Sequence, residues 1–90
     1  MSDPAFKALS DPTRREILRL LGRRDMSVGE IVDKFAMSQP SISRHLAVLR
    51  SAGLVTARRD GQNVVYGLDT TVMQDVVRTL MDLAGRRKSP

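Results

Sequence analysis

The chain has 90 residues, of which 15 are lysine or arginine and 10 are aspartate or glutamate, and its formal net charge is +5. This length fits one domain over residues 1–90, and the absence of cysteine excludes disulfides, thiolate metal sites and thiol catalysis. A small basic domain with one tyrosine, two phenylalanines and no tryptophan favours double-stranded DNA as a partner over single strands, whose bases need aromatic platforms for stacking.

The N-terminal segment MSDPAFKALSDPTRRE lacks the apolar run of a signal peptide. No later segment is long and apolar enough to cross a bilayer. We therefore expect a cytoplasmic protein with no membrane partner.

Two Asp-Pro steps predict the starts of the first two helices. Asp3-Pro4 is expected to open a short helix with Phe6 and Leu9 on its apolar face. Asp11-Pro12 repeats the pattern, because aspartate caps free backbone N–H groups and proline at the first helical position has none to satisfy. The second helix weakens at Gly22, and its apolar face consists of Ile17, Leu18, Leu20 and Leu21.

Capping residues also predict a third and a fourth helix. Ser27 and Glu30 have the spacing of a capping box, in which each side chain satisfies a backbone N–H group of the other residue. Ser38 can cap a fourth helix that runs to about Ala52, and Gly53 follows where a left-handed residue is expected. The inward face of this fourth helix consists of Ile42, Leu46, Leu49 and Ala52.

The pattern then changes to that of a β-hairpin. Residues 54–59 and 63–68 are predicted as strands, and Asp60-Gly61 between them is a hairpin signal. Asp69 restarts a helix with an unusually wide apolar surface, and residues 86–90 form a basic tail that we expect to be flexible. The predicted fold is mainly α with a small β-hairpin, a winged helix-turn-helix with the element order ααααββα.

Two short helices over residues 27–35 and 39–52, joined by about three residues, have the proportions of a helix-turn-helix. The second helix of such a unit lies in the major groove, where its N-terminal residues contact base edges. Glutamine can bind adenine and arginine can bind guanine through two hydrogen bonds, and small residues allow close approach. The side chains that we expect to contact DNA from this helix are Ser38, Gln39, Ser41, Ser43, Arg44 and His45.

Three of these residues also have a purely structural interpretation. Ser38 can act only as the helix N-cap, and Arg44 can be a solvated charge on an exposed face. His45 flanks the inward face, so it is either a partly buried histidine with a protein partner or a donor to a DNA phosphate.

Basic and amide side chains surround the predicted hairpin tip. A β-ribbon of this size can lie along the DNA backbone and reach the minor groove, where arginine is favoured. We expect DNA contacts from Arg58, Arg59 and Gln62, although an ordinary charged hairpin has the same composition. Arg14 and Arg15 follow the Asp11-Pro12 cap, where the helix N-terminus can face the DNA backbone, so they are also predicted contacts.

Residues 5–84 resemble the ArsR-type winged-helix repressors through FKALSDPTRREILRLL and SVGEIVDKFAMSQPSISRHLAVLRSAGLVTARRDGQNVVYGLD. The most specific stretch is SQPSISRHLAVLRSAGLV, and within the family the chain is most similar to the SdpR-like autorepressors. The resemblance implies a transcriptional repressor that acts as a homodimer through its first and last helices. It also implies an imperfect inverted repeat near the protein's own promoter as the DNA site.

The sequence departs from the metal-sensing members of that family. At the positions of their Cys-x-Cys pair this chain has Ser27 and Gly29. The last helix offers Asp69, Asp75 and Asp82 but no histidine, and the one histidine of the chain lies on the fourth helix. Zinc, copper and arsenite sites need clusters of soft or imidazole ligands. We therefore expect no metal site, no cofactor and no metal response.

A chain this short builds only a modest core, and its first and last helices have more apolar surface than that core can cover. Closed two-fold pairing is the commonest way to bury such a surface. The predicted homodimer interface consists of Phe6, Leu9, Val72, Val76, Leu80 and Leu83.

The sequence disfavours an enzyme, because it has no plausible nucleophile–base pair and no phosphate-binding loop. A winged-helix module that binds proteins without specific DNA binding is the alternative function. Such a module would tend to have an apolar or acidic face where this chain has Gln, Ser, Arg and Ala. Repression could be relieved by a small-molecule inducer or by a partner protein, and the sequence leaves both open.

Overall fold

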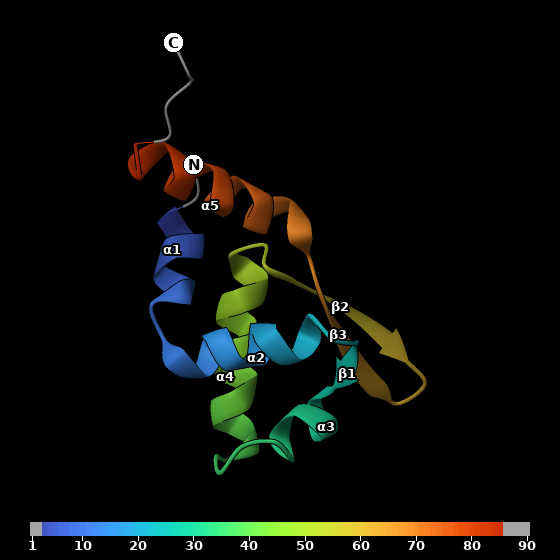
Figure 1. The fold of residues 1–90 in the computed structure, drawn as a ribbon. Coiled ribbons are helices and arrows are strands. Elements are labelled where there is room, and N and C mark those ends of the chain that lie inside the picture. Colours follow the sequence, from blue (N-terminus) through green and yellow to red (C-terminus); the bar gives the residue numbers. More distant parts are fainter. Residues whose placement is uncertain (1–2, 86–90) are drawn as a thin grey trace.

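The computed structural model describes residues 3–85, so the predicted flexible tail at residues 86–90 lies outside the described residues. Figure 1 shows α4 at the centre with α2 crossing it, α1 and α5 together at one end, and the β2–β3 hairpin projecting from the side. The elements in chain order are α1 (Asp3–Leu9), α2 (Pro12–Leu21), β1 (Met26–Ser27), α3 (Val28–Val32), α4 (Gln39–Ser51), β2 (Val55–Asp60), β3 (Asn63–Leu68) and α5 (Thr70–Leu83).

The N-caps predicted at Asp11, Ser27 and Ser38 are confirmed, whereas Asp3 is the first residue within α1. The Asp11 carboxylate accepts hydrogen bonds from the backbone N–H groups of Thr13 and Arg14, at 2.8 and 3.1 Å. Ser38 accepts one from the N–H of Ser41 at 3.3 Å, so α4 begins where the sequence placed it. Gly53 after α4 has φ +77°, which is the predicted left-handed conformation.

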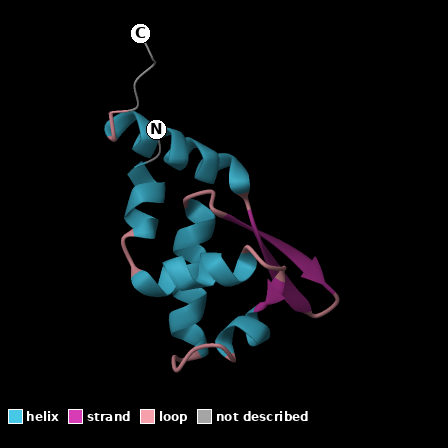
Figure 2. Cartoon of the chain, viewed as in Figure 1, coloured by secondary structure: helices cyan, strands magenta, loops and turns pink. Residues whose placement is uncertain are grey.

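The sheet has three strands in the order β1-β3-β2, one more than the hairpin that the sequence predicts (Figure 2). β1 is antiparallel to β3, with Met26 opposite Tyr66 and Ser27 opposite Val65. The predicted order ααααββα is therefore corrected by a short strand between α2 and α3. Two residues are too few to show an alternating pattern, and Ser27 is at the same time the N-cap of α3.

The third helix is also shorter than predicted. It ends at Val32, and the next turns have tighter hydrogen bonds, from the N–H of Lys34 to Ile31 O and from that of Phe35 to Val32 O. The apolar pattern reaches Phe35 because this side chain still packs against the core, although the helix has already ended. The connection between α3 and α4 is accordingly longer than the expected three residues.

One hydrophobic core joins these elements. Its largest fully buried side chains come from α2, α3, α4 and the segment before β2, and they are Ile17, Ile31, Ile42, Leu46, Leu49 and Leu54. α1 contributes only Ala5 and Ala8, and α5 contributes Val76. The core thus holds one face of α4 and leaves its opposite face to solvent.

Among residues 3–85 no helix is long and apolar enough to span a membrane.

Candidate nucleic-acid interface

The outward face of α4 is polar, basic and exposed. Gln39, Pro40, Ser43, Arg44 and Ala47 are all exposed, on the side opposite the buried stripe of the same helix. Within the described residues, none of these five side chains forms a hydrogen bond, so the polar atoms of Gln39, Ser43 and Arg44 are available to a ligand. α4 is 13 residues long and begins at a capped N-terminus. The outward side chains between Gln39 and Arg44 are the small residues Pro40 and Ser43.

Ser38 and Ser41 have a structural role at the start of α4. The Ser38 hydroxyl donates to the Ser41 hydroxyl at 3.0 Å, and the same oxygen accepts the Ser41 N–H. Ser38 is exposed and Ser41 is partly buried. The predicted capping role of Ser38 is confirmed, and contact of either serine with DNA stays a prediction.

His45 lies at the edge of α4, between the exposed and buried faces. Its Nδ1 atom is buried and has no hydrogen-bond partner among the described residues. A buried N–H without an acceptor is costly, so of the two tautomers of a neutral imidazole the one with the proton on Nε2 is favoured. That tautomer leaves an N–H donor on the other side of the ring.

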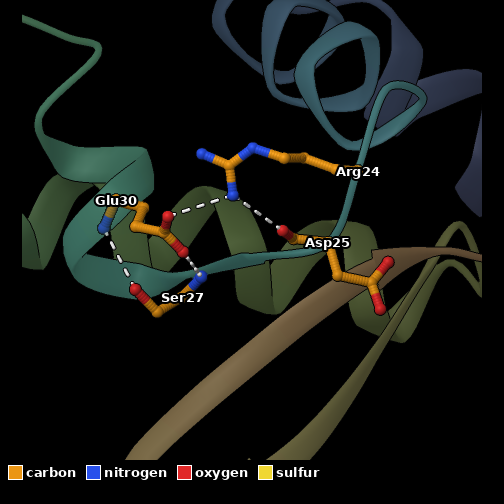
Figure 3. Close-up of polar contacts among 4 residues, drawn as sticks. All are labelled: Arg24, Asp25, Ser27 and Glu30. Carbon is orange, nitrogen blue, oxygen red and sulfur yellow. Dashed lines mark hydrogen bonds and ion pairs between the residues drawn. The ribbon is translucent and has the colours of Figure 1, made fainter.

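A network of hydrogen bonds fixes the start of α3 (Figure 3). The Ser27 N–H donates to Glu30 Oε1 at 2.9 Å, and the Glu30 N–H donates to Ser27 Oγ at 3.2 Å. Arg24 Nη1 donates to Glu30 Oε2 at 3.0 Å and to the backbone oxygen of Asp25 at 3.2 Å. The Ser27 N–H and then the Arg24 guanidinium hold the pKa of Glu30 below its ordinary value. The first helix of the helix-turn-helix is thereby tied to the loop that precedes β1.

The β2–β3 hairpin turns at Gly61, whose φ is +64°. Asp60 pairs with Asn63 at the tip, and Arg59 and Gln62 are exposed there. Arg58, which was predicted alongside Arg59, forms an ion pair with Asp25, with 2.7 Å between Nη1 and Oδ2. Successive residues of a strand point to opposite faces, so Arg58 and Arg59 lie on different sides of the hairpin.

Arg14 and Arg15 bind the C-terminal end of α1. Arg14 Nε donates to Ala8 O at 2.8 Å and Arg14 Nη2 donates to Lys7 O at 3.2 Å. Arg15 Nη1 donates to Leu9 O at 2.8 Å. The sequence interpretation missed this role, although basic residues are favoured next to free carbonyls at a helix C-terminus. Contact of either arginine with DNA stays a prediction.

The residues predicted for a dimer interface fall into three groups, which are buried, partly buried and exposed. Val76 is 3% exposed and belongs to the core of its own chain, which corrects its assignment to an interface. Phe6, Leu9 and Val72 are partly buried and pack against that core. An exposed apolar strip remains on α5, and it includes two residues absent from the predicted set; its exposed fractions are 53% for Val77, 51% for Leu80, 46% for Met81 and 75% for Leu83.

Residues 3–85 contain no group of three or more His, Cys, Asp or Glu side chains placed to hold a metal ion. Two of the three aspartates of the last helix region have other contacts. Asp69 caps α5 through the Thr71 N–H at 3.0 Å, and Asp75 pairs with Arg78 at 2.7 Å.

Comparisons with known proteins agree with this arrangement. The family described as "Bacterial regulatory protein, arsR family" matches residues 11–57, the range from the N-cap of α2 into β2. The chain is 46% identical to the transcriptional repressor SdpR of Bacillus subtilis over 81 residues, which are 90% of each chain. It is 38% identical to the transcriptional activator HlyU of Vibrio cholerae, over 83% of this chain and 69% of HlyU.

A solved structure, an ArsR-like transcriptional regulator from Rhodococcus sp. RHA1, is similar with a TM-score of 0.85 and 34% identity, over 91% of this chain and 75% of the other. The family match, the relatives and the fold thus agree with a DNA-binding role of the capped, exposed helix α4. The chain belongs to the arsR family of bacterial regulatory proteins and is a DNA-binding transcriptional regulator with a winged helix-turn-helix fold, not an enzyme.

Proposed function

We propose that this protein is a repressor that binds an inverted repeat in double-stranded DNA as a homodimer and controls its own promoter. The observation that supports this most is the exposed polar face of α4, whose outward side chains have no structural task within the chain. The relative with the higher identity and coverage of the two described above is a repressor, which favours repression over activation.

Gln39, Ser43 and Arg44 are the residues that we assign to base edges in the major groove. Arg44 can bind guanine and Gln39 can bind adenine, each through two hydrogen bonds. Ser38 and His45 lie next to this face. Ser38 would donate to a phosphate by giving up its hydrogen bond to Ser41, and His45 would donate through its Nε2–H. Arg59 and Gln62 at the hairpin tip would reach the flanking backbone or the minor groove.

The exposed strip of α5 supports the homodimer. Four large apolar side chains on one short helix form a surface that is costly to leave in water, and a two-fold axis lets the same strip cover itself. Two copies of α4 related by this axis would then read two half-sites, about one helical turn or a multiple apart.

Selection of bound duplexes from a random pool tests this proposal, followed by footprinting of the enriched sequence. We expect an inverted repeat with protection on one face of the DNA, and weaker binding to a scrambled duplex of equal length. Enrichment of no sequence would contradict specific DNA binding and favour a winged-helix module that binds proteins. Enrichment of a single half-site by a monomer would contradict the dimer.

A reporter gene placed behind the protein's own upstream region tests autorepression. We expect expression to rise when Arg44 and Gln39 are both replaced by alanine, with protein levels held equal by a separate promoter. An unchanged reporter would contradict autorepression.

A further inference from the structure

The ion pair between Arg58 and Asp25 crosses the three-stranded sheet. Arg58 is on β2, opposite Val65 of the central strand β3, and Asp25 immediately precedes β1 on the other side of β3. The two residues are 33 positions apart in the sequence, and 2.7 Å separates Arg58 Nη1 from Asp25 Oδ2. Their side chains therefore meet above the central strand.

Gly67 of β3 makes this meeting possible. A Cβ atom at this position would lie 2.7 Å from Asp25 Oδ1 and 3.1 Å from Asp25 Cγ, so any other residue would displace the carboxylate. Gly67 does not have a positive φ, so its backbone conformation does not require glycine. What the position requires is the absence of a side chain beneath the ion pair.

Asp25 also connects to the helix-turn-helix. Its backbone oxygen accepts a hydrogen bond from Arg24, whose guanidinium binds Glu30 in the capping box of α3. Figure 3 shows that the Asp25 carboxylate points away from this network, toward the strands. A continuous path of polar contacts thus runs from β2 of the hairpin, through Asp25 and Arg24, to the first turn of α3.

We propose that Asp25 is a positioning residue that fixes the hairpin against the helix-turn-helix by holding Arg58, and that Arg58 itself contacts no DNA. This inference rests on the proposed DNA binding and revises one of its predicted contacts. Arg59, on the opposite face of the hairpin and without a partner among residues 3–85, is the cation that binds a phosphate. Fixing the hairpin before binding lowers the cost of ordering two separate contact elements on one duplex.

The matched variants Arg58→Met and Arg59→Met separate the two roles. Arg59→Met should lower the log–log salt slope of binding to the selected duplex by about one unit per lost phosphate contact, hence about two per dimer. Arg58→Met should weaken binding roughly two- to fivefold per protomer, the range that an exposed ion pair is worth, and leave the slope unchanged.

Two further variants test the path itself. Gly67→Ala displaces Asp25 without changing the net charge, so it should weaken binding at an unchanged salt slope. The charge exchange Asp25→Arg with Arg58→Asp should restore most of the affinity lost in Arg58→Met. Asp25→Asn removes the carboxylate of the ion pair, and Asp33→Asn, which removes an exposed carboxylate of the α3–α4 connection, is the control for its loss of a negative charge.

Thermal unfolding of every variant distinguishes a positioning role from a general loss of the fold. We expect the melting temperatures of Arg58→Met and of the exchange variant to stay close to that of the original protein. A drop in salt slope for Arg58→Met equal to that for Arg59→Met would show that Arg58 binds phosphate, and the proposal would be wrong. Failure of the charge exchange to restore affinity in a folded protein would also contradict it.

A measurement without DNA keeps this inference separate from the proposed function. The guanidinium cross-peaks of Arg58 in a ¹⁵N–¹H spectrum should shift in Asp25→Asn and in Gly67→Ala, and should not shift in Asp33→Asn. If these signals are unchanged, the ion pair does not hold Arg58 in solution. If they shift but no variant, nor the original protein, binds any duplex, the proposed DNA binding fails and the contact remains.

Discussion

Val72 of α5 lies directly over Gly53, the residue that leaves α4 in a left-handed conformation. A Cβ atom on Gly53 would come within 2.9 Å of Val72 Cγ2. Gly53 has φ +77°, so both its backbone and its surroundings exclude a side chain. The end of α4 and the start of α5 are therefore packed together at this one glycine.

Gly53→Ala should lower the free energy of unfolding by about 2–4 kcal/mol, because left-handed strain of about 1–2 kcal/mol adds to the overlap with Val72. Gly61→Ala is the control, since Gly61 also has a positive φ but nothing within 4 Å of the added Cβ. Urea unfolding of both variants measures the difference. Equal losses would show that α5 moves away from Gly53 at no cost.

Leu80→Glu should convert the dimer to a folded monomer, because Leu80 is half exposed on the apolar strip of α5. Val76→Glu, one turn earlier, should instead unfold the chain at a cost of about 4 kcal/mol or more, because that side chain is buried. Gln74→Glu adds the same charge at an exposed position of α5 and should change neither property. Light scattering and circular dichroism decide the matter; a monomeric original protein would contradict the dimer.

Arg44→Ala should weaken binding to the selected duplex by about 1–3 kcal/mol per half-site and relax the preference at one base pair in each. Binding to a scrambled duplex should change much less. Arg50→Ala is the matched control, because Arg50 is an exposed arginine in the last turn of the same helix, far from its N-terminus. Equal weakening on both duplexes would make Arg44 a phosphate contact.

Zinc, cadmium and copper should leave DNA affinity unchanged apart from their effect on ionic strength. This expectation follows from the lack of a cluster of metal ligands within residues 3–85. Fluorescence anisotropy in the presence of each metal, with and without a chelator, measures it. A stoichiometric metal that shifts the operator affinity would overturn the argument from ligands.

The helix caps should remain stable down to mildly acidic pH. Hydrogen bonds from the Arg14 N–H to Asp11 and from the Ser27 N–H to Glu30 hold both pKa values below their ordinary values of 3.8 and 4.5. As the pH falls, the unfolded chain therefore binds protons at a higher pH than the folded chain does. The caps contribute fully to the free energy of unfolding above pH 4.5, and this contribution is lost as the pH falls through the lowered pKa values.

Urea unfolding at a series of pH values measures how the free energy of unfolding depends on pH. The double variant Asp11→Asn, Glu30→Gln is the control. Both replacement side chains can still accept a hydrogen bond but do not titrate. We expect a weaker dependence on pH below 4.5 in the double variant than in the original protein. The same dependence in both proteins would assign acid sensitivity to other carboxylates.

Local signals predicted most of the fold. Asp11, Ser27 and Ser38 each begin a helix because a short polar side chain satisfies free N–H groups, and this depends only on neighbours in the sequence. β1 could not be predicted in the same way, because Met26 and Ser27 become a strand only through pairing with β3, some 40 residues later.

The same difference between local signals and contacts distant in the sequence applies to the candidate site. The outward side chains of α4 follow from helical periodicity, so the exposure of Gln39, Ser43 and Arg44 could be predicted from the sequence, and their contact with DNA stays a prediction. The partners of Arg14 and Arg58 depend on contacts between separate elements, with Ala8 at the end of α1 and with Asp25 before β1. A surplus of arginine indicates a polyanion but does not reveal which arginines the fold itself uses.

The separation of the two faces of α4 has a consequence for how such regulators diversify. Ile42, Leu46 and Leu49 are buried and hold the helix in place, whereas Gln39 and Ser43 on the other side are exposed. Substitutions at such exposed positions usually change stability by less than about 0.5 kcal/mol. A duplicated gene could therefore acquire a new operator through a few changes on this face, with no compensating change elsewhere in the chain.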